Sequence, residues 1–293
     1  MQTVIGLGQA GCNIADQLKQ YSQYKIIKVD TELKKTKTSF GLKHQTSPRL
    51  YEEKLPRGMI KFLQEEVMPE TLFITSCGMV SGASLSILEK IKDKTDITVM
   101  YVIPKAEEAA GDKKLQNNLL FNVFQQYARS NLLKRVYLLD NQNIADIMGP
   151  VPIMKYWNTL NNLIAYTYHM INVLEHTKPM LTTVTNRIDT ARVSTIGLLD
   201  VENNEEKMFF SLDIPREKNY YYGVPKKQLE EDENLMETIQ NNVKNTKEHD
   251  KMKTTYSVYS TDYDKLYAYC EKSSTLIQKL APREICQGDF NQN

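Results

Sequence analysis

The sequence predicts an α/β fold: a doubly wound, mostly parallel sheet, then a long central helix and a smaller α+β C-terminal domain. Three observations predict it. Short apolar runs alternate with amphipathic stretches in the first half, which is typical of parallel strands buried on both faces. Two of these runs end in small-residue turns that lead into a helix. A later stretch is apolar around most of its circumference, as a helix buried between layers is.

The first half divides into strands and helices in turn. Val, Ile, Leu and Tyr dominate five strand candidates, which are Thr3–Leu7, Lys25–Asp30, Thr71–Thr75, Ile97–Ile103 and Arg135–Asp140. Apolar residues at helical spacing predict helices between them, at Asn13–Gln20, Met59–Val67, Ala83–Lys92 and Leu115–Ser130. Residues 31–58 are polar and contain two prolines, so we expect a long loop region there.

The second half begins with the long helix. Residues 158–175 carry an apolar stripe at helical period, and Pro179 ends it. Beyond it we expect strands at Leu181–Thr185, Ser194–Leu199, Met208–Leu212 and Thr254–Ser260, and a helix at Asp264–Leu280. Residues 226–253 are strongly charged and predict an exposed helix or a mobile insertion. The expected domains are 1–157, the helix 158–178, then 179–281 and a tail 282–293.

Composition excludes several classes of function. The formal net charge is +1, which gives no electrostatic footprint for nucleic acid or an anionic membrane. No apolar run is long enough to cross a bilayer, so we expect a cytoplasmic protein without membrane insertion. None of the four cysteines forms a CxxC pair and the histidines are scattered, so we expect no side-chain metal site.

The first small-residue turn follows the first strand. Gly6-x-Gly8-x-x-Gly11 lets the backbone approach a phosphate, and the free N–H groups of the next helical turn point toward it. Asp30 lies about 20 residues further on, as in a dinucleotide-binding fingerprint in which an acidic residue binds the ribose. The pattern predicts a nucleotide site and leaves open a nicotinamide-dependent oxidoreductase.

A second turn follows the third strong strand. Gly78 and Gly82 allow close backbone approach, and Ser81 and Ser84 supply hydroxyls for phosphate or metal. Because both turns follow parallel strands, they lie at the same edge of the sheet, where ligands bind. Two such turns favour a polyphosphate site over glycines that serve packing alone.

These residues resemble the tubulin/FtsZ superfamily over roughly residues 1–200. The first turn is similar to the family's first phosphate loop, and the second matches its GGGTG(T/S)G signature at Gly78, Ser81 and Gly82. The resemblance implies that GTP or GDP, with Mg²⁺, is bound by the two loops, at Gly8, Gln9, Ala10, Gly11, Cys12, Asn13, Gly78, Met79, Ser81, Gly82, Ala83 and Ser84.

The rest of the implied site comes from later segments. The resemblance implies that Asn141 contacts the guanine base, that Asn158, Asn161 or Asn162 adds a second contact, and that Glu108 reaches the ribose. It also implies head-to-tail filaments, in which the loop after the core helix enters the next subunit's nucleotide site.

That loop departs from the family form NxDxxD. Asn186 aligns with the first acidic residue and Asp189 with the second, so one carboxylate is missing. An amide polarises an attacking water poorly. We therefore expect weak or impaired GTP hydrolysis. The alternatives are a nucleotide-free, tubulin-like scaffold and, less favoured, the oxidoreductase, for which no proton relay is evident.

Overall fold

A single sheet runs through the whole molecule. The computed structural model describes residues 1–184, 186–244 and 252–280. In these residues twelve strands follow the order β3-β2-β1-β4-β5-β6-β8-β12-β10-β11-β7, with β9 paired to β8. The predicted α/β class with a mostly parallel sheet is confirmed.

The first part of the sheet is parallel throughout. Its strands are β1 (Gln2–Leu7), β2 (Tyr24–Asp30), β3 (Ser39–Gly41), β4 (Glu70–Thr75), β5 (Asp96–Ile103) and β6 (Arg135–Asp140). The five predicted strands are thus present, with ends within one residue of the prediction. The order reverses between β1 and β4, which is the position where ligands bind in doubly wound sheets.

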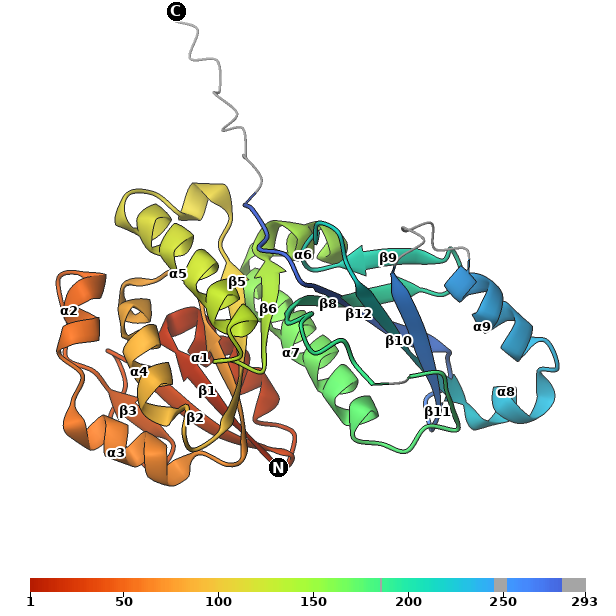
Figure 1. The fold of residues 1–293 in the computed structure, drawn as a ribbon, viewed down its shortest axis with the longest axis horizontal. Helices are drawn as coiled ribbons and strands as arrows, with labels where there is room; N and C mark the ends of the chain where they lie inside the picture. The colour runs from red at the N-terminus through yellow and green to blue at the C-terminus, as the bar shows by residue number, and fades with distance from the viewer. Residues whose placement is uncertain (185, 245–251, 281–293) are drawn as a thin grey trace, which may run out of the picture.

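Helices cover both faces of this parallel part (Figure 1). One core joins the sheet to α3 (Arg57–Glu66), α4 (Ser84–Ile91) and α5 (Asp112–Arg129). The other joins it to α1 (Gly8–Leu18), α6 (Asn141–Met148) and α7 (Tyr156–Glu175). Helix α7 also packs against the C-terminal strands, so it lies between the two parts of the molecule, as its apolar circumference predicts.

The C-terminal part differs more from the predictions. It contains β7 (Leu181–Thr182), β8 (Val193–Asp200), β9 (Glu205–Met208), β10 (Glu217–Pro225), α8 (Lys226–Glu231), α9 (Leu235–Lys244), β11 (Lys253–Thr261) and β12 (Tyr267–Ser274). The predicted helix at Asp264–Leu280 is wrong, because β12 occupies that segment and pairs with both β8 and β10. Tyr269 packs toward α7 and Cys270 toward α9. A strand buried on both faces lacks the polar alternation that would identify it.

Smaller corrections concern element ends. The first helix begins at Gly8 rather than Asn13, and the strand predicted at Met208–Leu212 lies earlier, as β9. The loop region 31–58 contains β3 and a short α2 (Pro48–Glu53). Helix α9 is not wholly exposed, since Leu235 and Ile239 are buried. The predicted tail 282–293 and residues 245–251 of the charged stretch lie outside the described residues. No described helix has the length and apolarity that a membrane span requires.

Candidate functional site

A cavity of about 420 Å³ lies at the switch point of the sheet. Its lining comes from the segments that directly follow β1, β4, β5 and β6, and from the first turns of α5 and α7. The two small-residue turns are therefore neighbours, because β1 and β4 pair in parallel register. Both turns therefore lie beside one cavity, at the same edge of the sheet.

The first turn presents backbone N–H groups to the cavity. Helix α1 begins at Gly8, whose φ of 71° is in the left-handed region that favours glycine. Gly8, Gln9 and Ala10 line the cavity, and no side chain in the described part of the chain caps this helix end. The first N–H groups of a helix have no intrahelical acceptor and lie at its positive end. The turn can therefore bind an anion.

The second turn adds a close backbone approach. Gly78 precedes the short 3₁₀ helix η1 (Met79–Ala83), and both Gly78 and Ser81 line the cavity. The Ser81 hydroxyl donates to the Gly78 carbonyl and so holds the turn closed. A Cβ atom at Gly78 would meet no atom within 4 Å, which leaves this glycine open to the cavity.

The cavity lining also carries amides and an aromatic ring. Asn141 begins α6, and its buried Oδ1 has no hydrogen-bond partner among the described residues. Asn161 and Trp157 project from the first turns of α7, and 49 % of Trp157 is exposed. A buried oxygen without a partner is costly unless a ligand or water satisfies it.

Two charged side chains complete the lining. Glu108 ends the short helix η2 (Ala106–Glu108), and its carboxylate accepts from the Lys105 backbone N–H. Lys113 lies in the first turn of α5. Burial raises the pKa of the Cys77 thiol, although Lys113 opposes this, so the thiol stays neutral beside the cavity.

Several predicted residues line this cavity, and others do not. Those that line it are Gly8, Gln9, Ala10, Asn13, Gly78, Ser81, Glu108 and Asn141. Of the three asparagines considered on α7, Asn161 lines it, whereas Asn158 bonds to Gln17 and Asn162 is exposed. Lys113 and Trp157 also line the cavity but were not predicted. The sequence offered two signals: Lys113 is a basic residue at the start of the helix after Pro104, and Trp157 is an aromatic residue four positions before Asn161.

The remaining loop residues serve packing in this structure. A Cβ atom at Gly11 would lie 2.3 Å from the Ile74 carbonyl oxygen, and one at Gly82 would lie 1.9 Å from that of Pro48. The Cys12 thiol contacts the carbonyl oxygens of Gly6 and Val29, and burial raises its pKa to about 12. These three residues hold α1 and η1 close to their neighbours.

Four further predicted residues also point elsewhere. Met79 packs against the core beside α4, so it does not fill the cavity. Ala83 and Ser84 are buried behind the turn. The Asp30 carboxylate accepts from the Thr31 N–H and does not reach the cavity lining. Among the described residues, none in the loop directly after β2 lines the cavity.

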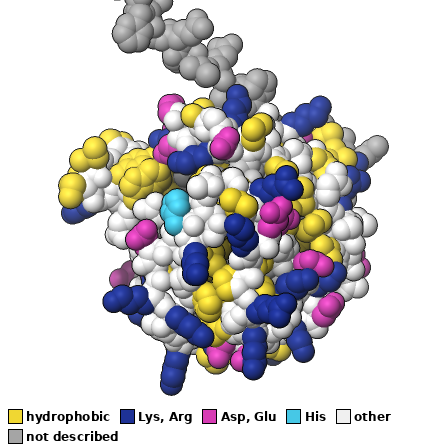
Figure 2. Space-filling model, turned by 90° about the vertical axis from the view of Figure 1, so that its left-hand side faces the viewer, with side chains coloured by type: hydrophobic (Ala, Val, Ile, Leu, Met, Phe, Trp, Pro, Cys, Tyr) yellow, Lys and Arg dark blue, Asp and Glu magenta, His cyan; other side chains and the backbone are white. Residues whose placement is uncertain are grey.

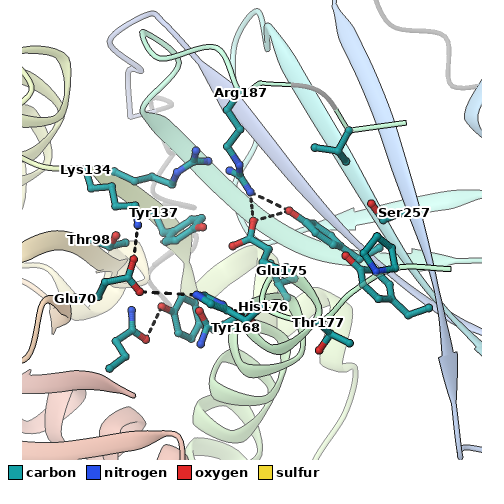
Figure 3. A pocket seen from close by; sticks show the side chains of 18 of the residues that line it. Glu70, Thr98, Lys134, Tyr137, Tyr168, Glu175, His176, Thr177, Arg187 and Ser257 are labelled. Carbon is teal, nitrogen blue, oxygen red and sulfur yellow. Dashed lines mark hydrogen bonds and ion pairs between the residues drawn. The ribbon is translucent and has the colours of Figure 1, made fainter. Parts of the chain in front are cut away.

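A second hollow of about 520 Å³ lies at the opposite edge of the parallel strands. It is bounded by the C-terminal end of α7, by the starts of β1, β4 and β6, and by the C-terminal strands (Figure 3). Its charges are paired. Arg187 contacts Glu175 and the fully buried Glu271, and Arg135 contacts Glu271 from the other side. Burial alone would raise the pKa of Glu271, but the two arginines lower it to about 2.

Asn186 and Asp189 belong to the loop beside this second hollow. Both are exposed, and their backbone carbonyls accept from Lys253 and Arg192. The 20 residues of α7 separate this loop from the cavity, a distance of about 30 Å at 1.5 Å per residue. The loop of one chain therefore cannot act on a ligand in the same chain's cavity.

Comparisons with known proteins identify the fold. No protein-family model matches the chain, and no curated protein sequence matches it. Among solved structures, a GTPγS-form protofilament of Bacillus thuringiensis serovar israelensis TubZ matches with a TM-score of 0.70 and 17% identity, over 93% of this chain and 86% of that chain. An empty FtsZ dimer from M. jannaschii matches with a TM-score of 0.67 and 12% identity, over 93% and 87%.

A GTPγS-bound protofilament of CetZ2 from Haloferax volcanii also matches, with a TM-score of 0.67 and 13% identity over 93% of this chain and 92% of that chain. TubZ, FtsZ and CetZ are members of the tubulin/FtsZ superfamily. Sequence identities this low support a shared architecture and nothing further. The chain has the fold of the tubulin/FtsZ superfamily.

Proposed function

We propose that the chain binds a guanine nucleotide in the switch-point cavity and assembles head to tail into filaments. One observation carries the binding proposal: the cavity lining combines free helix N–H groups and Lys113 with Asn141, Asn161 and Trp157. The first group suits a polyphosphate and the second a purine base.

The amide side chains suit the pairing edge of guanine. The unsatisfied Oδ1 of Asn141 is an acceptor, and guanine presents N–H donors on its pairing edge beside the O6 acceptor. The half-exposed indole of Trp157 offers a surface on which a base can stack. Mg²⁺ would be held mainly by the phosphates and water, since Glu108 is the only carboxylate in the described lining.

The cavity does not favour a nicotinamide dinucleotide. In that class the adenosine ribose lies over the end of the second strand, where an acidic residue binds it. Here the lining extends from β1 toward β5, β6 and α7, away from Asp30. A nucleotide-free scaffold would be favoured if Met79 filled the space beside the second turn, but Met79 packs into the core instead.

Head-to-tail assembly is supported by the positions of the cavity and the Asp189 loop at opposite ends of α7. Large apolar side chains are exposed at both ends. Ile153 and Met154 are 88% and 93% exposed just before α7, and Met180 is 70% exposed after it. Exposed apolar side chains at two different surfaces suit a heterologous contact between copies. In such a contact Asp189 would meet the neighbour's nucleotide, and hydrolysis would be weak because Asn186 cannot replace a carboxylate.

The only tryptophan of the chain tests the binding proposal. Because Trp157 lines the cavity, its fluorescence should change on titration with GTP, more strongly and at lower concentration than with ATP or NAD. Trp157→Phe should abolish the signal but retain binding measured by equilibrium dialysis. Equal responses to the three nucleotides would contradict guanine recognition, and no binding by either method would favour the nucleotide-free scaffold.

A further inference from the structure

The Asp189 loop, residues 186–192, sends one side chain into the second hollow. Arg187 extends from this loop toward Glu175 at the C-terminal end of α7 (Figure 3). Its Nη2 lies 2.9 Å from Oε2 of the fully buried Glu271 and donates to the Tyr221 hydroxyl oxygen at 3.0 Å. The three partners belong to α7, β12 and β10, so one side chain attaches the loop to three elements.

Arg187 differs from the basic side chains on the outer surface. Its side chain is 30% exposed, against 83% for Arg49 of α2, which pairs with Glu53 one helical turn away. Figure 2 faces the end of the molecule that carries α2, and it shows Lys and Arg side chains standing out from the surface there. Water competes for both charges of an exposed pair, so such a pair restrains the backbone little. A guanidinium held among largely buried acceptors restrains it more strongly.

The backbone on both sides of Asp189 is also restrained. Lys253 of β11 donates to the Asn186 carbonyl. Arg192 donates to the Asp189 carbonyl at 2.6 Å. The Asp189 residue is exposed, and its carboxylate has no hydrogen-bond or ion-pair partner in the described part of the chain. The loop thus fixes the backbone around one carboxylate and leaves that carboxylate available.

We infer that Arg187 is a positioning residue for GTP hydrolysis, which orients the loop so that the Asp189 carboxylate faces the nucleotide of the next copy. The Arg187 guanidinium is engaged by carboxylates of its own chain, so it acts through Asp189 rather than on the nucleotide. Displacing a reacting group by about 1 Å can slow a reaction severely. The inference rests on the proposed function and adds the residue that orients the loop.

Arg187→Met tests the inference, because methionine removes the charge but keeps much of the length of the side chain. Glu271 retains Arg135 and Glu175 is partly exposed to water, so the variant should fold. Phosphate release per assembled subunit should fall about tenfold. GTP affinity, measured by Trp157 fluorescence, and the concentration needed for assembly, measured by sedimentation, should not change.

Three matched variants separate positioning from general destabilisation. Arg187→Lys should regain most of the lost rate, since a single nitrogen of Arg187 makes the contacts and an ammonium has three donors. Arg135→Met removes the other cation from Glu271, so it should lower the melting temperature but leave the rate within about twofold of the wild type. Arg49→Met, at the exposed pair on α2, should change neither quantity.

A double-mutant cycle distinguishes positioning from a separate structural effect. If Arg187 acts through Asp189, Arg187→Met/Asp189→Ala should hydrolyse GTP no more slowly than Asp189→Ala alone. Two independent effects of about tenfold would instead multiply to about a hundredfold. Hydrogen exchange of the free chain gives a second readout, without nucleotide. Peptides that cover residues 186–192 should exchange faster in Arg187→Met than in Arg135→Met.

The possible failures are distinguishable. Multiplied effects in the double variant, equal rate losses in Arg187→Met and Arg135→Met, or unchanged exchange of the loop would each overturn the inference and leave the proposed function in place. Weaker GTP binding by Arg187→Met would also overturn it, because the residue would then act on the cavity. A wild-type chain that releases no phosphate from GTP at any concentration would overturn the inference together with the proposed hydrolysis. Trp157 fluorescence and sedimentation then report binding and assembly separately.

Discussion

The two hollows at the ends of α7 differ in how their polar groups are satisfied. At the N-terminal end the cavity exposes free helix N–H groups and the unpartnered Oδ1 of Asn141. At the C-terminal end Arg135 and Arg187 are paired with Glu271, to which Tyr137 also donates. The second hollow is the larger of the two, at about 520 against 420 Å³.

Volume alone therefore does not choose between the two hollows. A buried oxygen in a cavity wall that has no partner among the described residues, such as Oδ1 of Asn141, can accept a hydrogen bond from a ligand, whereas a saturated ion cluster favours a structural contact. We interpret the first hollow as the candidate binding site. The ion cluster at the second hollow is interpreted as a structural contact that holds β6, β12 and the Asp189 loop together. Four predictions test this difference, in order of decreasing expected effect.

Glu271→Leu should lower the free energy of unfolding the most. It leaves Arg135 and Arg187 without their buried counter-charge, and breaking a buried pair in this way costs about 3–5 kcal/mol. Urea denaturation measures the loss. Glu70→Leu removes the partly exposed pair with Lys134 in the same hollow and should cost about 1 kcal/mol or less. Similar losses for the two variants would contradict the structural role of the cluster.

Gly78→Leu should weaken GTP binding about a hundredfold, or roughly 3 kcal/mol, without changing the melting temperature. Its Cβ atom would meet no atom of the described residues within 4 Å, so the new side chain would extend into space that the cavity offers a ligand. Gly58→Leu is the matched control, because Gly58 is also open but lies on the exposed side of α3. Gly11→Leu is unsuitable, since its Cβ atom would strike Ile74 and disturb the fold. Normal affinity in Gly78→Leu would exclude this cavity as the binding site.

Acid should destabilise the protein through Glu271. Its folded-state pKa is lowered to about 2, so its contribution is fully present above the unfolded value near 4.5 and is lost as the pH falls toward 2. At pH 3 we expect a loss of roughly 1–2 kcal/mol from this residue. Urea denaturation at pH 6 and pH 3 measures it against Glu271→Gln, which should show a smaller difference. An equal difference in the two proteins would assign the acid sensitivity to other carboxyls.

Asp189→Ala should leave GTP affinity unchanged and lower the hydrolysis rate of assembled protein about tenfold, an effect near 1.4 kcal/mol. The residue lies far from its own cavity, so it can act only on a neighbour's nucleotide. Phosphate release above the assembly concentration gives the rate, and exposed Asp93→Ala serves as the control. An unchanged rate would remove Asp189 from the catalytic role.

The parallel half of the fold could be predicted because its signals are local. Continuous apolar runs identified β1, β2, β4, β5 and β6, and the turns at Gly8 and Gly78 identified the edge of the sheet where the switch-point cavity lies. The stripe along residues 158–175 identified α7, whose burial between the two parts follows from its apolar circumference.

Contacts between segments distant in sequence determined the elements and residue roles that could not be predicted from local patterns. Tyr267–Ser274 has apolar residues at helix-like spacing, but it forms a strand. It pairs through its backbone with β8 on one side and β10 on the other, and this pairing outweighs the local preference. The packing role of Gly11 and Gly82 depends on the backbone of Ile74 and of Pro48, which lies so close that no side chain fits. These contacts cannot be read from the sequence.

Lys113 and Trp157 joined the candidate site only because α5 and α7 begin at the same edge of the sheet. The sequence by itself determined which segments are apolar, which turns are rich in glycine and other small residues, and how the charges are distributed along the chain. The tertiary structure decided which of those groups share one cavity and which are neutralised by partners. Burial and charge pairing depend on segments far apart in sequence, and only their packing brings these together.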